Sequence, residues 1–338
     1  MSLSDSHISL AHGNGGRFMR ELIDEVFARH LANDVLDTTV DAARLALPGD
    51  RILFTTDGFT VQPLEFPGGS IGSLAVHGTT NDLAVSGGDP LFLSLNAFIE
   101  EGYEAALLER IVVDLARSAA ELGVRVAAGD TKVLPRGQGG GLYLATTGIG
   151  VMRHPGALGL NEIREGDALL VSGPVGDHAV AVLLAREQFG LRGEIRSDAG
   201  SVLPLTRALR GVPGLRFMRD PTRGGLVSVA HEIARATGLE VILDEPAVPV
   251  RPAVRAVCDI LGYDPYYLAC EGRVVAVMAP EAADHALAAW KAAPGGADAA
   301  VIGRLQAPQN GGAVALRTEL GGLRLLEELE DDPLPRIC

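Results

Sequence analysis

The chain has 338 residues, which is more than one typical domain and fits two. Hydrophobic residues make up 47% and aromatic residues only 4%, so aliphatic cores are expected. The net charge of −14 argues against nucleic acid as a partner, because phosphate binding needs clustered Lys and Arg. The N-terminus lacks the pattern of a secretion signal, and no apolar run approaches the roughly 18 residues of a membrane span. We therefore expect a soluble cytoplasmic protein.

The first half of the chain mixes strand and helix patterns. Apolar runs predict strands at 51–56, 90–99, 124–128 and 142–151, and apolar residues at helical spacing predict helices at 71–86 and 104–122. The first strand is expected to end in a turn at Asp57 and Gly58. The polar stretch 152–166 predicts a boundary, which places the first domain at 1–152.

The second half, placed at 153–326, shows the same mixture. Its predicted strands lie at 168–172, 239–243, 274–278, 299–302 and 313–317, and its predicted helices near 177–188, 201–210, 226–234 and 281–292. Long hairpin-like segments argue against a simple doubly wound sheet. The fold class predicted here is α/β, of the α+β type, in two domains of comparable size.

Residues 327–338 are predicted to form a separate tail. An acidic run precedes PLPRIC, in which proline favours an extended spacer. Cys258 and Cys270 lie in apolar sequence and are expected to pack as small hydrophobes, whereas Cys338 is the last residue. No C-x-x-C pair indicates a disulfide framework or a zinc site. A frayed end is the common alternative, but a stiff spacer ending in a thiol favours a mobile arm that delivers Cys338.

Acidic residues recur beside small residues at predicted strand ends and turns, namely Asp57, Asp82, Asp130, Asp220 and Glu271. Each alone is more typical of a turn or a helix cap. Together they favour a shared site, where carboxylates would repel one another unless a cation intervened. Mg²⁺ suits such oxygen ligands and bridges them to phosphates.

Two glycine-containing segments are candidate phosphate sites. In RDPTRGG, Asp220 or Thr222 is expected to cap the following helix, while Gly224 and Gly225 would let a ligand approach its N–H groups. Arg219 and Arg223 would add charge-assisted bonds, and the alternative is an ordinary capped helix.

The second segment, AHGNGG, contains Gly13, Gly15 and Gly16, whose amides are expected to close over phosphates; the alternative is a simple turn. In GDTK, Lys132 is expected to follow a turn, where it would meet a phosphate or transfer a proton. An exposed lysine without such a role is the alternative.

Several standard motifs do not account for the sequence. It contains neither the G-x-x-x-x-G-K-[ST] phosphate loop nor H-E-x-x-H. The stretch Gly68–Gly72 matches G-x-S-x-G, but Pro67 interrupts the strand that this nucleophile motif requires. A hydrolase is therefore the weaker interpretation.

Seven segments run in order over essentially the whole chain. They are AHGNGG, TTDGFTVQP, FPGGSIGSLAVHGTTNDLAV, AAGDTKVLPRG, MRDPTRGGL, CEGR and the C-terminal PRIC. Together they resemble the HypE family of hydrogenase maturation proteins, in the superfamily of aminoimidazole ribonucleotide synthetase and selenophosphate synthetase. PRIC is the motif that separates this family from its relatives. Cys270 stands where the family pattern leads us to expect Asn.

This resemblance implies a PurM-like two-domain protein that dimerises through its N-terminal domains, with MgATP near that interface. A HypF-type partner would carbamoylate Cys338, and the chain would use ATP to dehydrate the group to S-cyanide. The nitrile would pass to iron on a HypC–HypD complex during assembly of the [NiFe]-hydrogenase cofactor. Glu271 and Lys132 are implied as candidate bases. Nucleotide and metal would be held by Asp57, Asp82, Asp130 and Asp220, with Asn81, Thr131, Lys132, Thr222, Gly225, the glycine loop and Arg223 or Gly224.

Two other functions are kept as alternatives. Another ATP-dependent member of the superfamily, such as a selenophosphate synthetase, would need a reactive Cys or Sec near the first glycine loop, and positions 1–20 contain neither. A carrier whose tail only shuttles a group, with nucleotide as a conformational switch, is the second. ATP turnover that depends on a carbamoylated tail separates the enzyme from the carrier.

Overall fold

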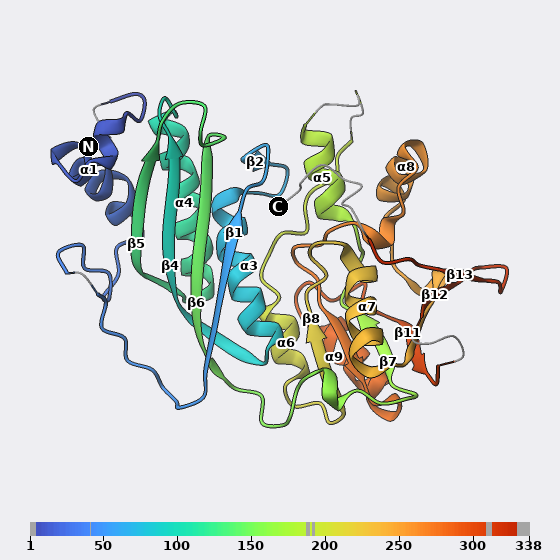
Figure 1. The fold of residues 1–338 in the computed structure, drawn as a ribbon. Helices are drawn as coiled ribbons and strands as arrows, with labels where there is room; N and C mark the ends of the chain where they lie inside the picture. The colour runs from blue at the N-terminus through green and yellow to red at the C-terminus, as the bar shows by residue number, and fades with distance from the viewer. Residues whose placement is uncertain (1–4, 41, 187–189, 191–192, 309–312, 330–338) are drawn as a thin grey trace. The chain divides into compact units, whose positions relative to one another are not determined.

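The computed structural model describes residues 5–40, 42–186, 190, 193–308 and 313–329 (Figure 1). These residues form two compact units, one over 5–83 and 89–152 and the other over 84–88 and 153–329. Each unit combines a β-sheet with helices packed against it. The predicted two-domain architecture of mixed α/β class is confirmed.

The first unit is built on a sheet with the strand order β1-β6-β4-β5. Its strands are β1 (Ile52–Phe59), β4 (Gly88–Glu100), β5 (Arg125–Leu134) and β6 (Leu142–Met152), with a small ribbon of β2 (Glu65–Phe66) and β3 (Gly69–Ser70). Its helices are α1 (Arg17–Leu22), α2 (Arg29–Leu31), α3 (Ile71–Val85) and α4 (Ala105–Leu122), with a π-helical segment at Ile23–Ala28 and a 3₁₀ helix at Leu10–Gly13. β1 pairs antiparallel with β6, whereas β4 and β5 are parallel and are connected through α4.

Helix α4 illustrates why this layer forms. Its apolar residues Leu108, Ile111 and Leu115 recur at helical spacing and are buried. Gly123 then adopts a φ of 68°, the left-handed conformation that commonly ends helices.

The other side of the first sheet is different. On β1, Phe54 is 70% exposed, so the described residues leave its side of the sheet uncovered.

The second unit is built on a larger sheet with the order β13-β12-β9-β11-β7-β10-β8. Its strands are β7 (Ala168–Val171), β8 (Leu215–Arg219), β9 (Glu240–Asp244), β10 (Val275–Met278), β11 (Ala300–Gln306), β12 (Val314–Arg317) and β13 (Leu323–Leu325). Its helices are α5 (Asp177–Ala185), α6 (Leu203–Leu209), α7 (Gly225–Thr237), α8 (Pro252–Leu261) and α9 (Ala283–Ala292). Neighbouring strands are antiparallel except β9 and β12.

Both faces of the central strand β7 are buried. Leu169 and Val171 belong to one core cluster with α7, and Ala168 and Leu170 belong to another with α6 and α9. A strand with both faces buried has apolar residues at successive positions rather than at alternate ones. This double burial explains the unbroken apolar stretch at 168–171.

Two predicted turns are wrong. Asp57 and Gly58 lie inside β1, paired with Thr146 and Ala145 of β6. Lys132 lies inside β5, which continues to Leu134, well beyond the predicted strand end at residue 128. Small and polar residues favour turns locally, but pairing with a neighbouring strand overrides that preference.

Other elements follow from contacts that the sequence pattern does not reveal. Helices α1, α2 and α8 and strands β8 and β13 were not predicted.

Ser70, in the G-x-S-x-G stretch, is buried, with its hydroxyl bonded to Asp114 and accepting the N–H of Gly72 at 3.2 Å. Ser70 therefore stabilises the start of α3, and its burial does not support the hydrolase interpretation.

Candidate nucleotide and catalytic sites

The N-terminal glycine loop lies against β5. A Cβ at Gly13 would be 2.9 Å from the Cβ of Val133, so only glycine allows this approach. Gly15 has a φ of 75°, and Gly16 immediately precedes α1. A Cβ at either would meet no described atom within 4 Å. The loop therefore combines close packing on β5 with open space over its last two glycines, which suits binding of phosphate through backbone amides.

Asp130 and Lys132 form an ion pair on β5. Lys132 Nζ is 2.8 Å from Asp130 Oδ2, and both side chains are more than half exposed. The hydrogen bond from Lys132 lowers the pKa of Asp130. Because side chains alternate along a strand, residues 130 and 132 project to the same side. Lys132 is thus held in place while its ammonium stays accessible to a phosphate.

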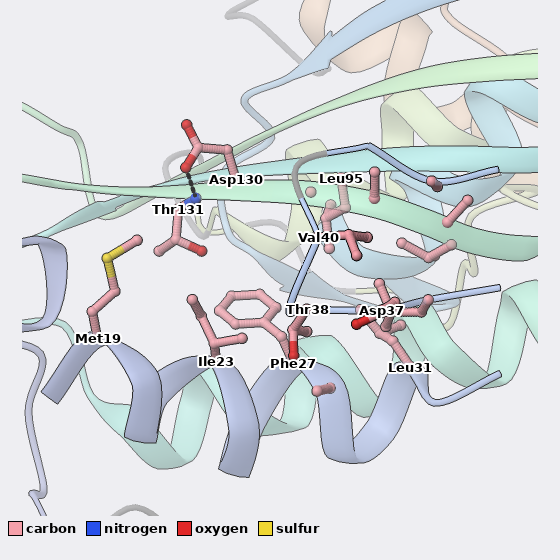
Figure 2. Close-up of a pocket in the computed structure, with 17 residues that line it drawn as sticks. Met19, Ile23, Phe27, Leu31, Asp37, Thr38, Val40, Leu95, Asp130 and Thr131 are labelled. Atoms are coloured by element: carbon pink, nitrogen blue, oxygen red, sulfur yellow. Dashed lines mark hydrogen bonds between the residues drawn. The ribbon is translucent and has the colours of Figure 1, made fainter. Parts of the chain in front are cut away.

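Thr131 projects to the other side of β5, into a cavity of about 190 Å³ (Figure 2). Met19, Ile23 and Phe27 of the N-terminal helical segment form the facing wall. Figure 2 shows the Thr131 side chain directed toward these residues and the Asp130 carboxylate directed away from them. Thr131 N–H donates to Asp130 Oδ1 at 2.8 Å. Thr131 therefore contacts, through its backbone, the Asp130 carboxylate that projects from the other side of β5.

Asp57 and Asp82 are both held by threonines at the contact between β1 and α3. Thr79 Oγ1 donates to Asp57 at 3.3 Å, and Thr55 Oγ1 donates to Asp82 at 2.8 Å. Asn81, the neighbour of Asp82 in the chain, is buried. The structure therefore brings these predicted site residues together on the α3 side of β1. The two threonines were not singled out from the sequence, although the TTDG and TTND patterns contain them.

The four predicted metal ligands do not meet in one cluster. Strands β1 and β5 are opposite edges of the first sheet, about 14 Å apart at the usual strand spacing, so Asp57 and Asp130 cannot share an ion within one chain. Asp220 belongs to the second unit. Within the described ranges, no three His, Cys, Asp or Glu side chains are grouped to hold a metal ion. Mg²⁺ bound to a nucleotide needs only one or two carboxylates, and the oxygen donors of Asp57 and Asp82 fit that requirement.

In the second unit, the RDPTRGG and CEGR segments are neighbours. Cys270 N–H donates to the carbonyl of Pro221 at 3.0 Å, which joins the two segments through their backbones. Asp220 and Glu271 are only 8% and 4% exposed. The predicted base Glu271 is therefore largely protected from water, beside the loop that leads into α7.

The start of α7 differs from the prediction. Its N-cap is Gly224, and neither Asp220 nor Thr222 caps it with a side chain. Gly224 and Gly225 have φ values of 72° and 60°, and a Cβ at Gly225 would be 2.6 Å from the carbonyl oxygen of Leu268. The two glycines are thus required by backbone conformation and, at Gly225, by close packing.

The two arginines of RDPTRGG have different surroundings. Arg219 Nη2 lies 2.8 Å from a carboxylate oxygen of Glu232 on α7, so its guanidinium already has an acidic partner. Arg223 is exposed on the loop that leads into α7. Arg223 is therefore the better placed of the two to meet a phosphate.

Cys270 makes two hydrogen bonds to the backbone of the second unit. Its Sγ accepts the N–H of Gly176 at 3.2 Å, and its thiol donates to the carbonyl of Leu268 at 3.6 Å. The side chain is completely buried, which raises the pKa of the thiol well above its ordinary value. Cys270 thus hydrogen-bonds to the local backbone at the position where the resemblance leads us to expect Asn.

The first residues of the predicted tail are anchored on the second unit. The Tyr267 hydroxyl donates to the carbonyl of Glu327 at 2.8 Å, and Arg235 on α7 forms an ion pair with Glu328. The remaining residues from 330, including PRIC and Cys338, lie outside the described residues.

Comparison with known proteins gives matches over both units. The family models for the N-terminal and C-terminal domains of AIR synthase related protein match residues 39–152 and 164–315. Carbamoyl dehydratase HypE from Rhodobacter capsulatus is 46% identical over the full length of both chains, and the protein of that name from Escherichia coli K12 is 43% identical over 98% of this chain and 100% of its own. The chain belongs to the HypE family.

Solved HypE structures agree with this assignment. A HypE in complex with ATP has a TM-score of 0.92 and 42% identity, covering 98% of this chain and 99% of its own. A HypE–HypF complex has a TM-score of 0.80 and 36% identity, covering 93% and 100%. The fold of this HypE-family chain is therefore the PurM-like one that the resemblance implies. No helix in the described part is both long and apolar enough to cross a membrane.

Proposed function

We propose that this chain uses ATP to dehydrate a carbamoyl group on its own Cys338 to S-cyanide, which supplies cyanide ligands to the iron of [NiFe]-hydrogenase. The full-length similarity to carbamoyl dehydratases carries this proposal. The ATP-bound HypE structure supports ATP as the co-substrate. We place the reaction in the cytoplasm, where thiols are kept reduced.

The acceptor thiol follows from the state of the other two cysteines. Cys258 is 1% exposed and Cys270 is completely buried, and burial raises the pKa of both thiols, that of Cys258 to about 11. A nucleophilic thiolate is therefore disfavoured at either position near neutral pH. Cys338 remains as the thiol that takes the carbamoyl group.

The glycine loop, Asp130 and Lys132 are proposed to bind the nucleotide, with Arg223 as a further phosphate contact. Lys132 neutralises phosphate charge, and loop amides donate to phosphate oxygens. Asp57 and Asp82 would hold Mg²⁺, which supplies charge neutralisation at phosphates. Because β1 and β5 are opposite edges of the first sheet, these phosphates would be the ones bound at β5 of a second copy of the chain. Positioning and charge neutralisation are what phosphoryl transfer mainly requires.

The chemistry then has two steps. The carbamoyl oxygen attacks the γ-phosphorus, the bond to the ADP oxygen breaks, and one N–H proton passes to solvent, which leaves an S-bound iminophosphate. Glu271 next removes the remaining N–H proton, the C–O bond breaks, and phosphate leaves as the C≡N bond forms. Oxygen is a poor leaving group until it is phosphorylated, so the order is fixed. Glu271 is favoured over Lys132 as the base because it is buried, whereas Lys132 is paired with Asp130.

A homodimer and two partners complete the proposal. Phe54 is 70% and Ile52 41% exposed on β1, and both lie on the uncovered side of the first sheet. Exposed apolar groups of this kind mark association surfaces, and a second copy of the chain would cover them. A HypF-type carbamoyltransferase would load Cys338, which the HypE–HypF complex supports. A HypC–HypD complex carrying iron would accept the cyanide.

ATP turnover tests the proposal. We expect the carbamoylated protein to release one equivalent of phosphate per tail. The Cys338→Ala variant should release none. Glu271→Gln should bind ATP normally and release phosphate at least tenfold more slowly, as loss of a general base predicts. Equal phosphate release by carbamoylated and unmodified protein would contradict the dehydratase function.

A further inference from the structure

Asp198 is a buried carboxylate bound to the backbone that carries Glu271. It lies in the loop before α6, and its two oxygens accept the N–H groups of Glu271 and Gly272, each at 3.3 Å. The side chain is 1% exposed. Two consecutive N–H donors bound to one carboxylate fix the orientation of the peptide between them. The position from which the Glu271 side chain projects is therefore set by Asp198.

The same loop contacts this backbone at further points. Gly200 N–H donates to the carbonyl of Glu271 at 3.5 Å. A Cβ at Gly272 would lie 1.9 Å from the carbonyl oxygen of Asp198, so only glycine lets the two segments pack this closely. The segment 198–200 thus holds the backbone of Glu271 through both its N–H and its carbonyl.

Arg273 in turn holds Asp198. Its Nε is 3.4 Å from Asp198 Oδ2 and donates to the carbonyl of Pro174 at 2.9 Å. Its Nη2 is 3.5 Å from Asp177, which Arg251 contacts at 2.8 Å. Burial raises the pKa of Asp198, and Arg273 together with the two N–H donors opposes that shift. Removing one member of such a buried network leaves an uncompensated charge, so breaking this network is expected to destabilise the fold.

We propose that Asp198 is a positioning residue for Glu271, holding its backbone so that the carboxylate meets the nitrogen of the S-carbamoyl group. The inference rests on the proposed function, in which Glu271 removes the proton. Catalytic groups must be held within about 0.5 Å of the productive geometry, and a misplacement of about 1 Å costs about 100-fold in rate. The sequence RSDAGS gives no sign of this role, because a polar loop of this kind is typical of a turn.

The test measures single-turnover dehydration in full-length protein carbamoylated at Cys338. Asp198→Asn replaces one acceptor oxygen with an NH₂ group that cannot accept an N–H. It is expected to lower the rate about 10- to 100-fold, with an unchanged half-saturating ATP concentration. In a Glu271→Gln background, Asp198→Asn should cause no further loss, because both changes act through one group. A wild-type rate for Asp198→Asn, or additive losses in the double variant, would overturn the inference.

Asp177→Asn is the matched control. Asp177 belongs to the same network and is 3% exposed, but its ion pairs are with Arg251 and Arg273. We expect a similar loss of thermal stability in both variants, with the rate reduced only by Asp198→Asn. Equal rate losses would show a general effect on the fold and overturn the inference. Asp198→Ser, which keeps one acceptor oxygen, replaces Asp198→Asn if the latter does not fold, with the same expectation.

The Glu271→Gln variant alone distinguishes failure of Glu271 as the base from failure of Asp198 as its positioning residue. A wild-type dehydration rate in this variant would overturn Glu271 as the base, and the role of Asp198 with it. A slow Glu271→Gln together with a wild-type Asp198→Asn would overturn only the role of Asp198.

Discussion

Lys132 Nζ lies 2.8 Å from Asp130 Oδ2, two residues earlier on the same strand of the first sheet. The lysine is thus directed by a neighbour that the strand geometry fixes, while more than half of its side chain stays in contact with solvent. An exposed ion pair contributes only about 0.2–1 kcal/mol to folding stability. The pair is therefore better suited to position the Lys132 ammonium for binding a phosphate than to stabilise the fold.

Lys132→Ala is expected to lower the single-turnover dehydration rate of the carbamoylated protein at subsaturating ATP about 10- to 100-fold, because a hydrogen bond to a charged group contributes about 1.5–3 kcal/mol. The melting temperature should change little. Arg110→Ala is the control, since Arg110 forms a similarly exposed pair with Glu65 at 3.0 Å in the same unit. Single-turnover phosphate release measured over a range of ATP concentrations checks the difference, and equal effects of the two changes would contradict a nucleotide role for Lys132.

Phe54→Asp is expected to convert the proposed dimer to monomer at micromolar concentration, because it places a charge in an apolar contact. Sedimentation velocity measures the change. Ile260→Asp is the control: Ile260 is 66% exposed, but it lies on α8 of the second unit. A Phe54→Asp protein that sediments like the wild type would show that this face of the sheet is not the dimer contact.

His77 is expected to make the fold sensitive to mild acid. Burial lowers its pKa to about 4, from 6.5 in the unfolded chain, although Asp114 opposes the shift. Between these values the unfolded chain binds a proton that the folded chain does not, so the free energy of unfolding falls as the pH falls. The loss from pH 7 to pH 5 is about 2 kcal/mol.

Urea unfolding at the two pH values measures this loss. A His77→Gln variant removes the titrating group and should show a pH dependence smaller by that amount. An unchanged pH dependence would contradict the assignment to His77.

Differential alkylation tests the state of the cysteines. In the native protein at pH 7, iodoacetamide is expected to modify Cys338 and to leave Cys258 and Cys270 unmodified, because both are buried and their pKa values are raised. All three thiols should react in urea. Modification of Cys270 in the folded protein would contradict its structural role.

Sequence patterns predicted the elements whose apolar residues lie on one face or form one run. The helix at Ala105–Leu122 and the strand at Ala168–Val171 are examples, since burial decides both the residue pattern and the structure. The turn at Asp57 was predicted wrongly because its neighbours are small and polar, whereas the pairing with Thr146 lies 89 residues away in the chain. Such long-range pairing is not visible in a local pattern.

The candidate site shows the same division. Residues within motifs, such as Glu271 and Lys132, could be named as candidates from the sequence because phosphate binding and proton transfer need those residue types. Asp198 was missed because its importance lies in two backbone N–H groups of residues 271 and 272, which any sequence would supply. Gly225 was singled out as a residue that lets a ligand approach, but the packing that requires glycine there is visible only in the fold, because an added Cβ would lie 2.6 Å from the carbonyl oxygen of Leu268.

Self-dehydration of the carbamoylated Cys338 can be followed directly by mass. Cyanate carbamoylates thiols without a partner, so the full-length protein can be loaded with cyanate and then given MgATP. Intact mass with peptide mapping follows the C-terminal peptide, and Cys338→Ala is the control. The proposed function predicts that this peptide gains one HNCO unit and then loses one water only when ATP is present. A carbamoyl group that stays intact while MgATP is demonstrably bound would contradict it.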